Sequence, residues 1–288
     1  AAQSRGFQVV PHTLYVVGTP IGNLDDMTFR AVQVLQAVDL IAAEDTRHTG
    51  KLLQQFQITT RQLSFHDHNQ AQRIPELIAR LQQGAAIALV SDAGMPGVSD
   101  PGYELVAACA TAGITVVPIP GASASLCALS ASGLPTDRFV FEGFLPTKSK
   151  PRRDRLEALV QEPRTLILYE APHRLLATLT DLAAHLGGDR PVTLARELTK
   201  RFEEFWRGNL ATAIAHYTDH NPQGEFTIVI QGAPALGDTL VFSEDALKRE
   251  LQALMAQGLS RSQASRELAH RTARPRRDLY QLALTLSD

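Results

Sequence analysis

Short apolar runs alternate with longer stretches of helical periodicity from Thr13 to about Gly232. Several of the runs are apolar throughout and are bounded by Gly, Pro or Asp, as is typical of strands buried on both faces of a sheet. The predicted strands are Leu14–Val17, Leu40–Ala43, Ile87–Ser91, Thr115–Ile119, Phe139–Glu142, Thr165–Tyr169, Val192–Ala195 and Phe226–Ile230.

Between these runs, apolar residues recur three and four positions apart, which predicts helices that each bury one face. The recurrence is clearest in two sets, Ala31, Val32, Leu35 and Val38, and then Ile74, Leu77, Ile78 and Leu81. Strands that alternate with helices predict an α/β fold with mostly parallel strands.

Two breaks divide this pattern. Gly133-Leu134-Pro135 ends one helical stretch before a new strand, and the Pro- and Gly-containing segment Gly232–Asp238 ends the last strand. Beyond it the pattern is purely helical, over Ser243–Gln257, Ser260–Arg271 and Pro275–Leu286, and Ser243 precedes an acidic first turn as a helix N-cap does. We therefore predict a disordered tail (1–12), an N-terminal α/β domain (13–134), a second α/β domain (135–234) and a small all-helical module (239–288).

Composition fits a globular protein with no need of disulfides or metal. The 288 residues suffice for two α/β domains, and 44% hydrophobic and 20% charged residues are ordinary values. Cys109 and Cys127 lie in small apolar stretches that we interpret as helix interiors in a reducing compartment. The first dozen residues lack the apolar core of a signal peptide, and no segment approaches a membrane span, so we expect a cytoplasmic protein.

Positive charge is local, because the formal net charge is only −2. One basic run extends from Lys148 to Arg155. The other extends from Leu259 to Arg277, where six arginines face the single acid Glu267: Arg261, Arg266, Arg271, Arg274, Arg276 and Arg277. Such a run is consistent with a solvated helix face. Two arginine-rich helices joined by a short turn fit phosphate contacts better.

Loops rich in Gly, Pro and acidic residues follow the predicted strands, where open α/β sheets hold ligands. Each also has a purely structural interpretation: a tight turn for Val16–Asn23, an Asp–Arg helix cap for Ala42–Gly50, a rigid loop for Leu89–Gly102. Pro20 stands where a dinucleotide-binding fingerprint would need Gly. Further loops of this kind are Ile119–Ser125, Leu168–Arg174, Ala195–Gly208 and Gly224–Ile230, and together they predict a ligand cleft with contributions from both domains.

A metal site is disfavoured. His66 and His68 would share one face of a strand, and His173 lies in a later loop, but no third ligand accompanies the first two.

The ordered motifs TPIGN, AEDTRHT, SDAG-P-SDPG, PG-SA, YE-PHR, ARELTK-FEE and GE before a strand resemble the tetrapyrrole methylase superfamily. More narrowly, EDTRHT and ARELTK resemble its ribosomal RNA branch, the 16S rRNA (cytidine-1402)-2′-O-methyltransferases, from about Leu14 to Ile230. The sequence departs from the family pattern at three positions. Ala or Pro is commoner at Gly18, Thr at Met95 and Pro at Ala122.

The resemblance implies two α/β domains that bind S-adenosylmethionine (SAM) in the cleft between them, a homodimer, and 16S rRNA of the small ribosomal subunit as partner, with no membrane. Carried over motif by motif, the cofactor pocket would consist of Pro20, Asp92, Ala93, Gly94, Val98, Ala122, Ser123, Tyr169, Ala171, Glu225, Phe226 and Thr227. Asp92 would accept hydrogen bonds from a ribose or amino group.

Methyl transfer to a ribose 2′-hydroxyl requires an in-line approach and benefits from a nearby base or cation, but no metal. The candidate catalytic residues are Glu44, Asp45, Glu170, Glu197 and Lys200, among which the sequence does not choose. Arg47, Arg196 and Lys200 follow strands directly, so we expect them to face the RNA, as we do the six C-terminal arginines.

Two other functions are consistent with the motifs. A corrin-type tetrapyrrole methylase would share the fold, but a small acidic tetrapyrrole does not require a basic helical module. A non-catalytic RNA-binding adaptor would have kept the fold without binding SAM.

Overall fold

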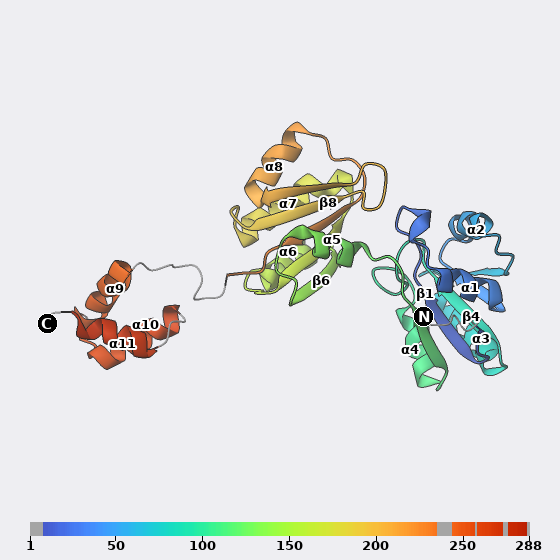
Figure 1. Ribbon diagram of the computed structural model, residues 1–288, viewed down its shortest axis with the longest axis horizontal. Coiled ribbons are helices and arrows are strands. Elements are labelled where there is room, and N and C mark those ends of the chain that lie inside the picture. The colour runs from blue at the N-terminus through green and yellow to red at the C-terminus, as the bar shows by residue number, and fades with distance from the viewer. Residues whose placement is uncertain (1–7, 235–243, 257, 273–275, 287–288) are drawn as a thin grey trace, which may run out of the picture. The chain divides into compact units, whose positions relative to one another are not determined.

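The computed structural model describes residues 8–234, 244–256, 258–272 and 276–286 (Figure 1). Contacts divide the chain into two compact units. One comprises Ala1–Glu157 and Thr165–Gln231 and holds both sheets, and the other comprises Ala158–Arg164 and Gly232–Asp288. The predicted boundaries at 134/135 and 234/239 stay predictions.

The first sheet is parallel throughout, with the order β3-β2-β4-β1-β5. Its strands are β1 (Thr13–Val17), β2 (Leu40–Ala43), β3 (Gln62–Ser64), β4 (Ala86–Val90) and β5 (Thr115–Ile119). The carboxyl ends of parallel strands meet at one edge, so the loops that follow β1, β4 and β5 converge there.

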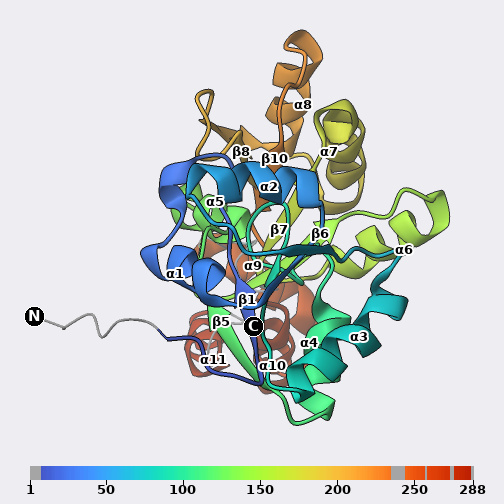
Figure 2. The same ribbon diagram turned by 90° about the vertical axis from the view of Figure 1, so that its right-hand side faces the viewer.

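Helices cover both faces of this sheet, as Figure 2 shows. On one face, α1 (Phe29–Ala37) and α2 (Thr46–Gln55) pack against Tyr15, Val17 and Ile41. On the other, α3 (Gln70–Gln82) and α4 (Tyr103–Thr111) pack against Leu14 and Val16. Successive strand residues point to opposite faces, and in the central strands β2 and β4 both sets are buried, which is why these two strands are apolar throughout. A 3₁₀ turn, η1 (Leu24–Asp26), precedes α1.

The second sheet is mixed, with the order β6-β7-β10-β8-β9. Its strands are β6 (Phe139–Phe144), β7 (Thr165–Glu170), β8 (Pro191–Arg196), β9 (Glu204–Asn209) and β10 (Phe226–Ile230). Only β6 and β7 are parallel, and β10 runs antiparallel to both β7 and β8. The expectation of mostly parallel strands is therefore wrong for this sheet, because β8 and β9 form an antiparallel pair joined by a short connection.

Helix α5 (Ala124–Ser132) follows the first sheet in the chain but packs on the second. Its Ala128 and Leu129 lie in one buried cluster with Ile167, Ala195 and Val229. The remaining helices of this unit are α6 (Ser149–Leu159), α7 (Pro172–Leu186) and α8 (Leu210–Asp219).

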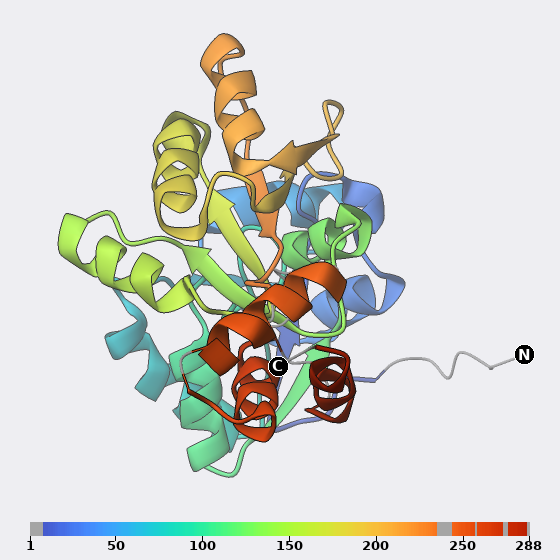
Figure 3. The ribbon, with the colours of Figure 1, turned by 90° about the vertical axis from the view of Figure 1, so that its left-hand side faces the viewer.

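The second unit contains α9 (Glu244–Ala256), α10 (Arg261–Thr272) and α11 (Arg276–Leu284), drawn in red in Figure 3. They share a core that includes Leu247, Leu251, Leu268 and Leu279. The predicted helical module is thus present, while the predicted N-cap Ser243 lies outside the described residues. Among those residues, no helix has the length and apolar character of a membrane span.

Two further expectations need correction. His66 and His68 do not share a strand, because β3 ends at Ser64 and both histidines lie in the connection to α3. Strands β3 and β9 were not among the predicted ones. The two cysteines do lie in helices, Cys109 in α4 and Cys127 in α5.

Candidate active site

Three loops at the carboxyl edge of the first sheet are joined by backbone contacts. Thr19 after β1 and Gly94 after β4 exchange hydrogen bonds, with N···O distances of 2.9 and 3.0 Å. The Thr19 hydroxyl also donates to the Ser91 carbonyl at 3.2 Å. Gly18 and Gly121 approach so closely that a Cβ on Gly121 would lie 2.7 Å from the Gly18 backbone. Glycine is required here for backbone approach, which fixes the loops relative to one another.

These loops form one wall of a cavity of about 460 Å³, a volume ordinary for a small-molecule site. Loops of the second sheet form the other wall. The lining residues are Ile21, Ala93, Gly94, Met95, Val98, Ser99, Asp100, Ser123, Ala124, Phe144, Tyr169, Glu170, Ala171, Pro172, Ala195, Leu198, Lys200, Glu225, Phe226 and Thr227.

Tyr169, on β7, is joined to the start of α5, the helix that follows the loop after β5. Its hydroxyl accepts a hydrogen bond from the backbone N–H of Ser125 at the start of α5, at 3.2 Å. Its ring packs edge-on against Phe141 and Phe144, with centroids 5.0 and 5.7 Å away. Burial raises the pKa of Tyr169, so the hydroxyl stays protonated at neutral pH.

Most residues predicted to hold the cofactor line this cavity: Ala93, Gly94, Val98, Ser123, Tyr169, Ala171, Glu225, Phe226 and Thr227. Pro20, Asp92 and Ala122 do not, although each is next to a lining residue in the chain. Asp92 instead supports the neighbouring loop, because its Oδ1 accepts from the backbone N–H of Asp45 at 3.1 Å.

Two predicted catalytic carboxylates, Glu44 and Asp45, lie outside the cavity lining. Glu44 accepts from the Asp92 backbone N–H at 3.2 Å, and burial raises its pKa. Asp45 is the N-cap of α2 and forms an ion pair with Arg47 at 2.7 Å, which lowers the Asp45 pKa. The Asp–Arg pair therefore forms the helix cap that was the structural alternative for this motif.

Asp100 lines the cavity but was not among the predicted site residues. Burial and, to a smaller extent, the negative charges of Glu44 and Asp92 raise its pKa to about 6, against the lowering effect of a hydrogen bond from Ser91. The SDPG motif contained this residue, but its spacing gave no sign that Asp100, and not Asp92, would reach the cavity.

Glu170 lines the cavity but its carboxylate is fully engaged. Oε1 accepts from the Ala171 backbone N–H at 2.9 Å, and Oε2 accepts from the Thr178 hydroxyl at 2.6 Å. The side chain has no exposed surface. This arrangement favours a role in holding the wall over a role in proton transfer.

Lys200 lies between two carboxylates, Glu197 at 2.9 Å and Glu225 at 2.5 Å. Burial lowers the pKa of Lys200, but the hydrogen bonds to Glu225 and Glu197 outweigh burial, and the pKa is raised. Lys200 is therefore a permanent cation of the cavity wall. Burial alone would raise the pKa of Glu197, but the Glu225 backbone and Lys200 lower it.

Backbone strain collects beside the cavity. Ser99, Glu197 and Thr199 have positive φ angles of 62°, 50° and 66°, which non-glycine residues rarely adopt. Such strain is common at functional sites. Thr199 also buries a hydroxyl with no hydrogen-bond partner among the described residues.

The predicted RNA-contacting arginines vary in their surroundings. The Arg47 side chain is 88% exposed. Arg196 pairs with Glu204 at 3.2 Å and donates to the Gln223 carbonyl, so its guanidinium is engaged at the end of β8. Arg266, Arg276 and Arg277 are exposed, and Arg261 is partly buried, whereas the side chain of Arg271 and all of Arg274 lie outside the described residues.

No group of three or more metal-ligating side chains occurs among the residues that the structure describes. The cavity is thus lined by apolar groups, backbone and a few charges.

Comparison with known proteins assigns the family. Residues 13–214 match the model of the tetrapyrrole (corrin/porphyrin) methylases, and residues 242–287 match that of the RsmI C-terminal HTH domain. The chain belongs to the tetrapyrrole methylase family. It is 66% identical over 273 residues to ribosomal RNA small subunit methyltransferase I of Synechocystis sp., covering 95% of this chain and 98% of that protein. The protein of the same name from Escherichia coli O157:H7 is 55% identical, over 82% of each chain.

Solved structures share the fold of this family. Uroporphyrin-III-C-methyltransferase from Thermus thermophilus superposes with a TM-score of 0.55 at 22% identity, covering 76% of this chain and 94% of that one. The methyltransferase CobJ gives a TM-score of 0.56 at 18% identity, with coverage of 76% and 94%. The family model and the relatives confirm the predicted family and methyltransferase activity, and the solved structures agree with the predicted α/β fold class.

Proposed function

We propose that this methyltransferase transfers a methyl group from SAM to the ribose 2′-hydroxyl of cytidine 1402 in 16S rRNA of the small ribosomal subunit. The observation that carries the proposal is 66% identity to a ribosomal RNA small subunit methyltransferase over nearly the whole chain. The match includes the C-terminal helices, which a methylase acting on a small tetrapyrrole does not require.

The cavity suits SAM as the cofactor. Apolar groups such as Ile21, Met95 and Leu198 can cover an adenine ring, and the Asp100 carboxylate supplies negative charge for a cationic ligand. The sequence motifs that resemble those of the family lie mostly in these loops. When bound, SAM supplies an activated methyl group on a sulfonium centre.

The acceptor hydroxyl must release its proton to solvent water as it receives the methyl group, so charge near its oxygen matters. Lys200 is held cationic at the cavity wall by Glu197 and Glu225, and we assign it the stabilisation of the developing oxyanion. Glu170, with both oxygens already accepting hydrogen bonds, holds the wall.

We also propose that the protein acts in the cytoplasm as a homodimer. The described surface exposes large apolar side chains, including Phe29 at 91%, Tyr103 at 71% and Phe202 at 64%. Contact with a second copy would cover such groups. Sedimentation of purified protein measures the oligomeric state directly, and a monomer at micromolar concentration would contradict the proposal.

Mass spectrometry of small-subunit rRNA from cells with and without this protein tests the function. We expect the 2′-O-methyl group on cytidine 1402 to disappear with the protein and to return when it is restored. Its persistence in cells without the protein would refute the assignment.

The competing function is methylation of a tetrapyrrole, the activity in the name of the Thermus thermophilus neighbour. Those neighbours are 22% identical or less and support the fold alone. Methyl transfer to a tetrapyrrole acceptor, without transfer to small subunits, would favour this alternative.

A further inference from the structure

Helix α6 presents a basic face to solvent. Lys148, directly before the helix, and Lys150 and Arg153 within it are all exposed. In the part of the chain that the structure describes, neither lysine forms an ion pair, and Arg153 has only Glu157, at 3.7 Å with both side chains 62% exposed. An exposed pair of this kind contributes little, so all three cations are available to a polyanion.

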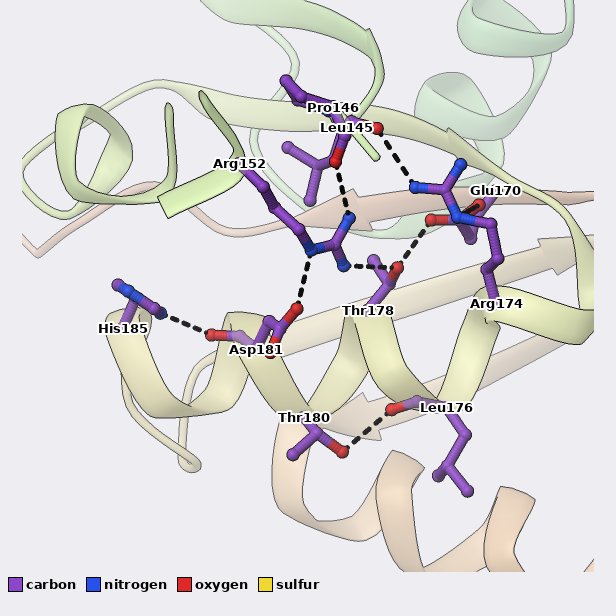
Figure 4. Close-up of polar contacts among 10 residues, drawn as sticks. All are labelled: Leu145, Pro146, Arg152, Glu170, Arg174, Leu176, Thr178, Thr180, Asp181 and His185. Atoms are coloured by element: carbon purple, nitrogen blue, oxygen red, sulfur yellow. Dashed lines mark hydrogen bonds and ion pairs between the residues drawn. The ribbon is translucent and has the colours of Figure 1, made fainter. Parts of the chain in front are cut away.

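The opposite side of α6 is anchored firmly by Arg152, as Figure 4 shows. Its Nε donates to Asp181 Oδ2 at 2.7 Å, and its Nη2 donates to the Thr178 hydroxyl at 2.9 Å, both on α7. The Arg152 side chain is only 13% exposed. A planar guanidinium that donates in several fixed directions sets the orientation of the helix that carries it.

The anchor continues to the cavity wall. A hydroxyl has one proton, and the Thr178 oxygen already accepts from Arg152, so its proton is directed to Glu170 Oε2, 2.6 Å away. Arg174 lies 3.5 Å from the other Glu170 oxygen and donates to the Leu145 carbonyl at 3.1 Å. The turn between β6 and α6 is thereby tied to the buried carboxylate that lines the cavity (Figure 4).

The basic face is also near the cavity along the chain. Phe144 lines the cavity, and Lys148 follows four residues later. Four residues span at most about 14 Å when fully extended. Cations at this distance can reach phosphates within a few nucleotides of a ribose held at the cavity.

We propose that α6 is a docking element for the sugar-phosphate backbone of the acceptor RNA, through Lys148, Lys150 and Arg153, with Arg152 as the positioning residue that holds the helix beside the cavity. The proposal rests on RNA being the acceptor. It adds a second RNA-binding surface to the arginines of the C-terminal helices, and it commits to phosphate contacts, which carry no sequence information.

The test compares K148Q/K150Q with R61Q/R138Q. The control pair removes the same charge from exposed arginines directly before β3 and β6, whereas α6 follows the carboxyl end of β6. Affinity for purified small subunits is measured against salt concentration. Loss of two phosphate contacts should make the log–log slope shallower by about 1.4 to 1.8. The salt slope of R61Q/R138Q should match the wild-type slope, and both double variants should bind SAM with wild-type affinity.

An unchanged slope for K148Q/K150Q, or an equal change in the control, would overturn the proposal. This binding readout does not depend on which nucleotide is methylated. A shallower slope without methylation of cytidine 1402 would keep the docking surface and reject the proposed function.

Arg152 is tested by repeating K148Q/K150Q in R152M and in the milder T178V. If Arg152 holds the basic face in place, the lysine substitutions should lose most of their effect in R152M, and part of it in T178V. Full additivity in folded variants would contradict the positioning role. If R152M does not fold, the result with T178V decides whether Arg152 has this positioning role.

Discussion

Asp100 is the cavity carboxylate whose charge changes nearest to neutral pH. Its pKa is raised from 3.8 to about 6, chiefly by burial, so the folded protein retains a proton that the unfolded chain loses. Stability from this group therefore falls as pH rises from about 4 through 6. A bound sulfonium acts in the opposite direction on the Asp100 pKa, because a nearby cation favours the ionised carboxylate.

We expect SAM affinity to increase as pH rises through about 6, by up to about tenfold if the cofactor lowers the Asp100 pKa by one unit. Asp100→Asn should flatten this dependence. Calorimetric titration from pH 5 to 7.5 measures both. A pH dependence that is the same in the variant would remove Asp100 from the vicinity of the cation.

Lys200 is the cavity cation, and its substitution separates binding from chemistry. Lys200→Met keeps the apolar stem and removes the charge, so turnover should fall about tenfold or more at saturating SAM while SAM affinity changes little. Lys200→Arg should retain more activity. Lys51→Met, at an exposed position on α2, is the control. Loss of SAM binding with normal turnover in Lys200→Met would contradict the assignment.

At the scale of elements, the approach of the loops after β1 and β5 determines the shape of the cavity. A Cβ on Gly121 would lie 2.7 Å from the backbone of Gly18, which cannot be relieved by rotating a side chain. Gly121→Ala should therefore separate the two loops and weaken SAM binding at least about tenfold, or ~1.4 kcal/mol. Gly113→Ala, in open space at the other end of β5, controls for loss of stability, since its positive φ also strains alanine. Equal SAM affinity in Gly121→Ala and the wild type would show that the loops tolerate separation.

The sequence predicts buried elements better than edge elements. Central strands such as β4 and β10 are buried along their whole length and were identified from their apolar runs. Strands β3 and β9 are edge strands with partly exposed side chains and lack such runs, whereas the edge strands β5 and β6 are still rich in apolar residues and were identified. Strand direction was missed in the second sheet, because apolar periodicity is the same for parallel and antiparallel strands.

The cavity was predicted at the level of loops more than of single residues. Family motifs placed Gly94, Tyr169 and Thr227 at a cofactor site, and the structure brings them together. Phe144 was missed because its position depends on how β6 pairs with β7, which no local motif encodes. Asp92 was expected at the ligand; its side chain does not line the cavity and accepts a hydrogen bond from the Asp45 backbone N–H, and its contact with the cofactor stays a prediction.

At the scale of the whole molecule, the C-terminal helices have a core of their own. Leu251, Leu268 and Leu279 are almost completely buried among α9, α10 and α11. Ending the chain at Gly237 should therefore leave a folded protein that still binds SAM. It should bind small subunits more weakly and with a shallower salt slope, because arginines such as Arg266 and Arg277 are lost.

Circular dichroism and SAM titration of the truncated protein check the first expectation, and salt-dependent binding checks the second. Equal slopes for the truncated and full-length proteins would mean that the helices contribute no phosphate contacts. The RNA contacts would then belong to α6 and the cavity.

The most direct measurement is methyl transfer by the purified protein to small subunits that lack the modification. Isotopically labelled SAM is supplied, and the labelled nucleotide is located by mass spectrometry of nuclease fragments. The account predicts one methyl group per subunit, on the 2′-oxygen of cytidine 1402, and none in the reaction without protein. A label on another nucleotide, on a base, or only on a tetrapyrrole acceptor would contradict it.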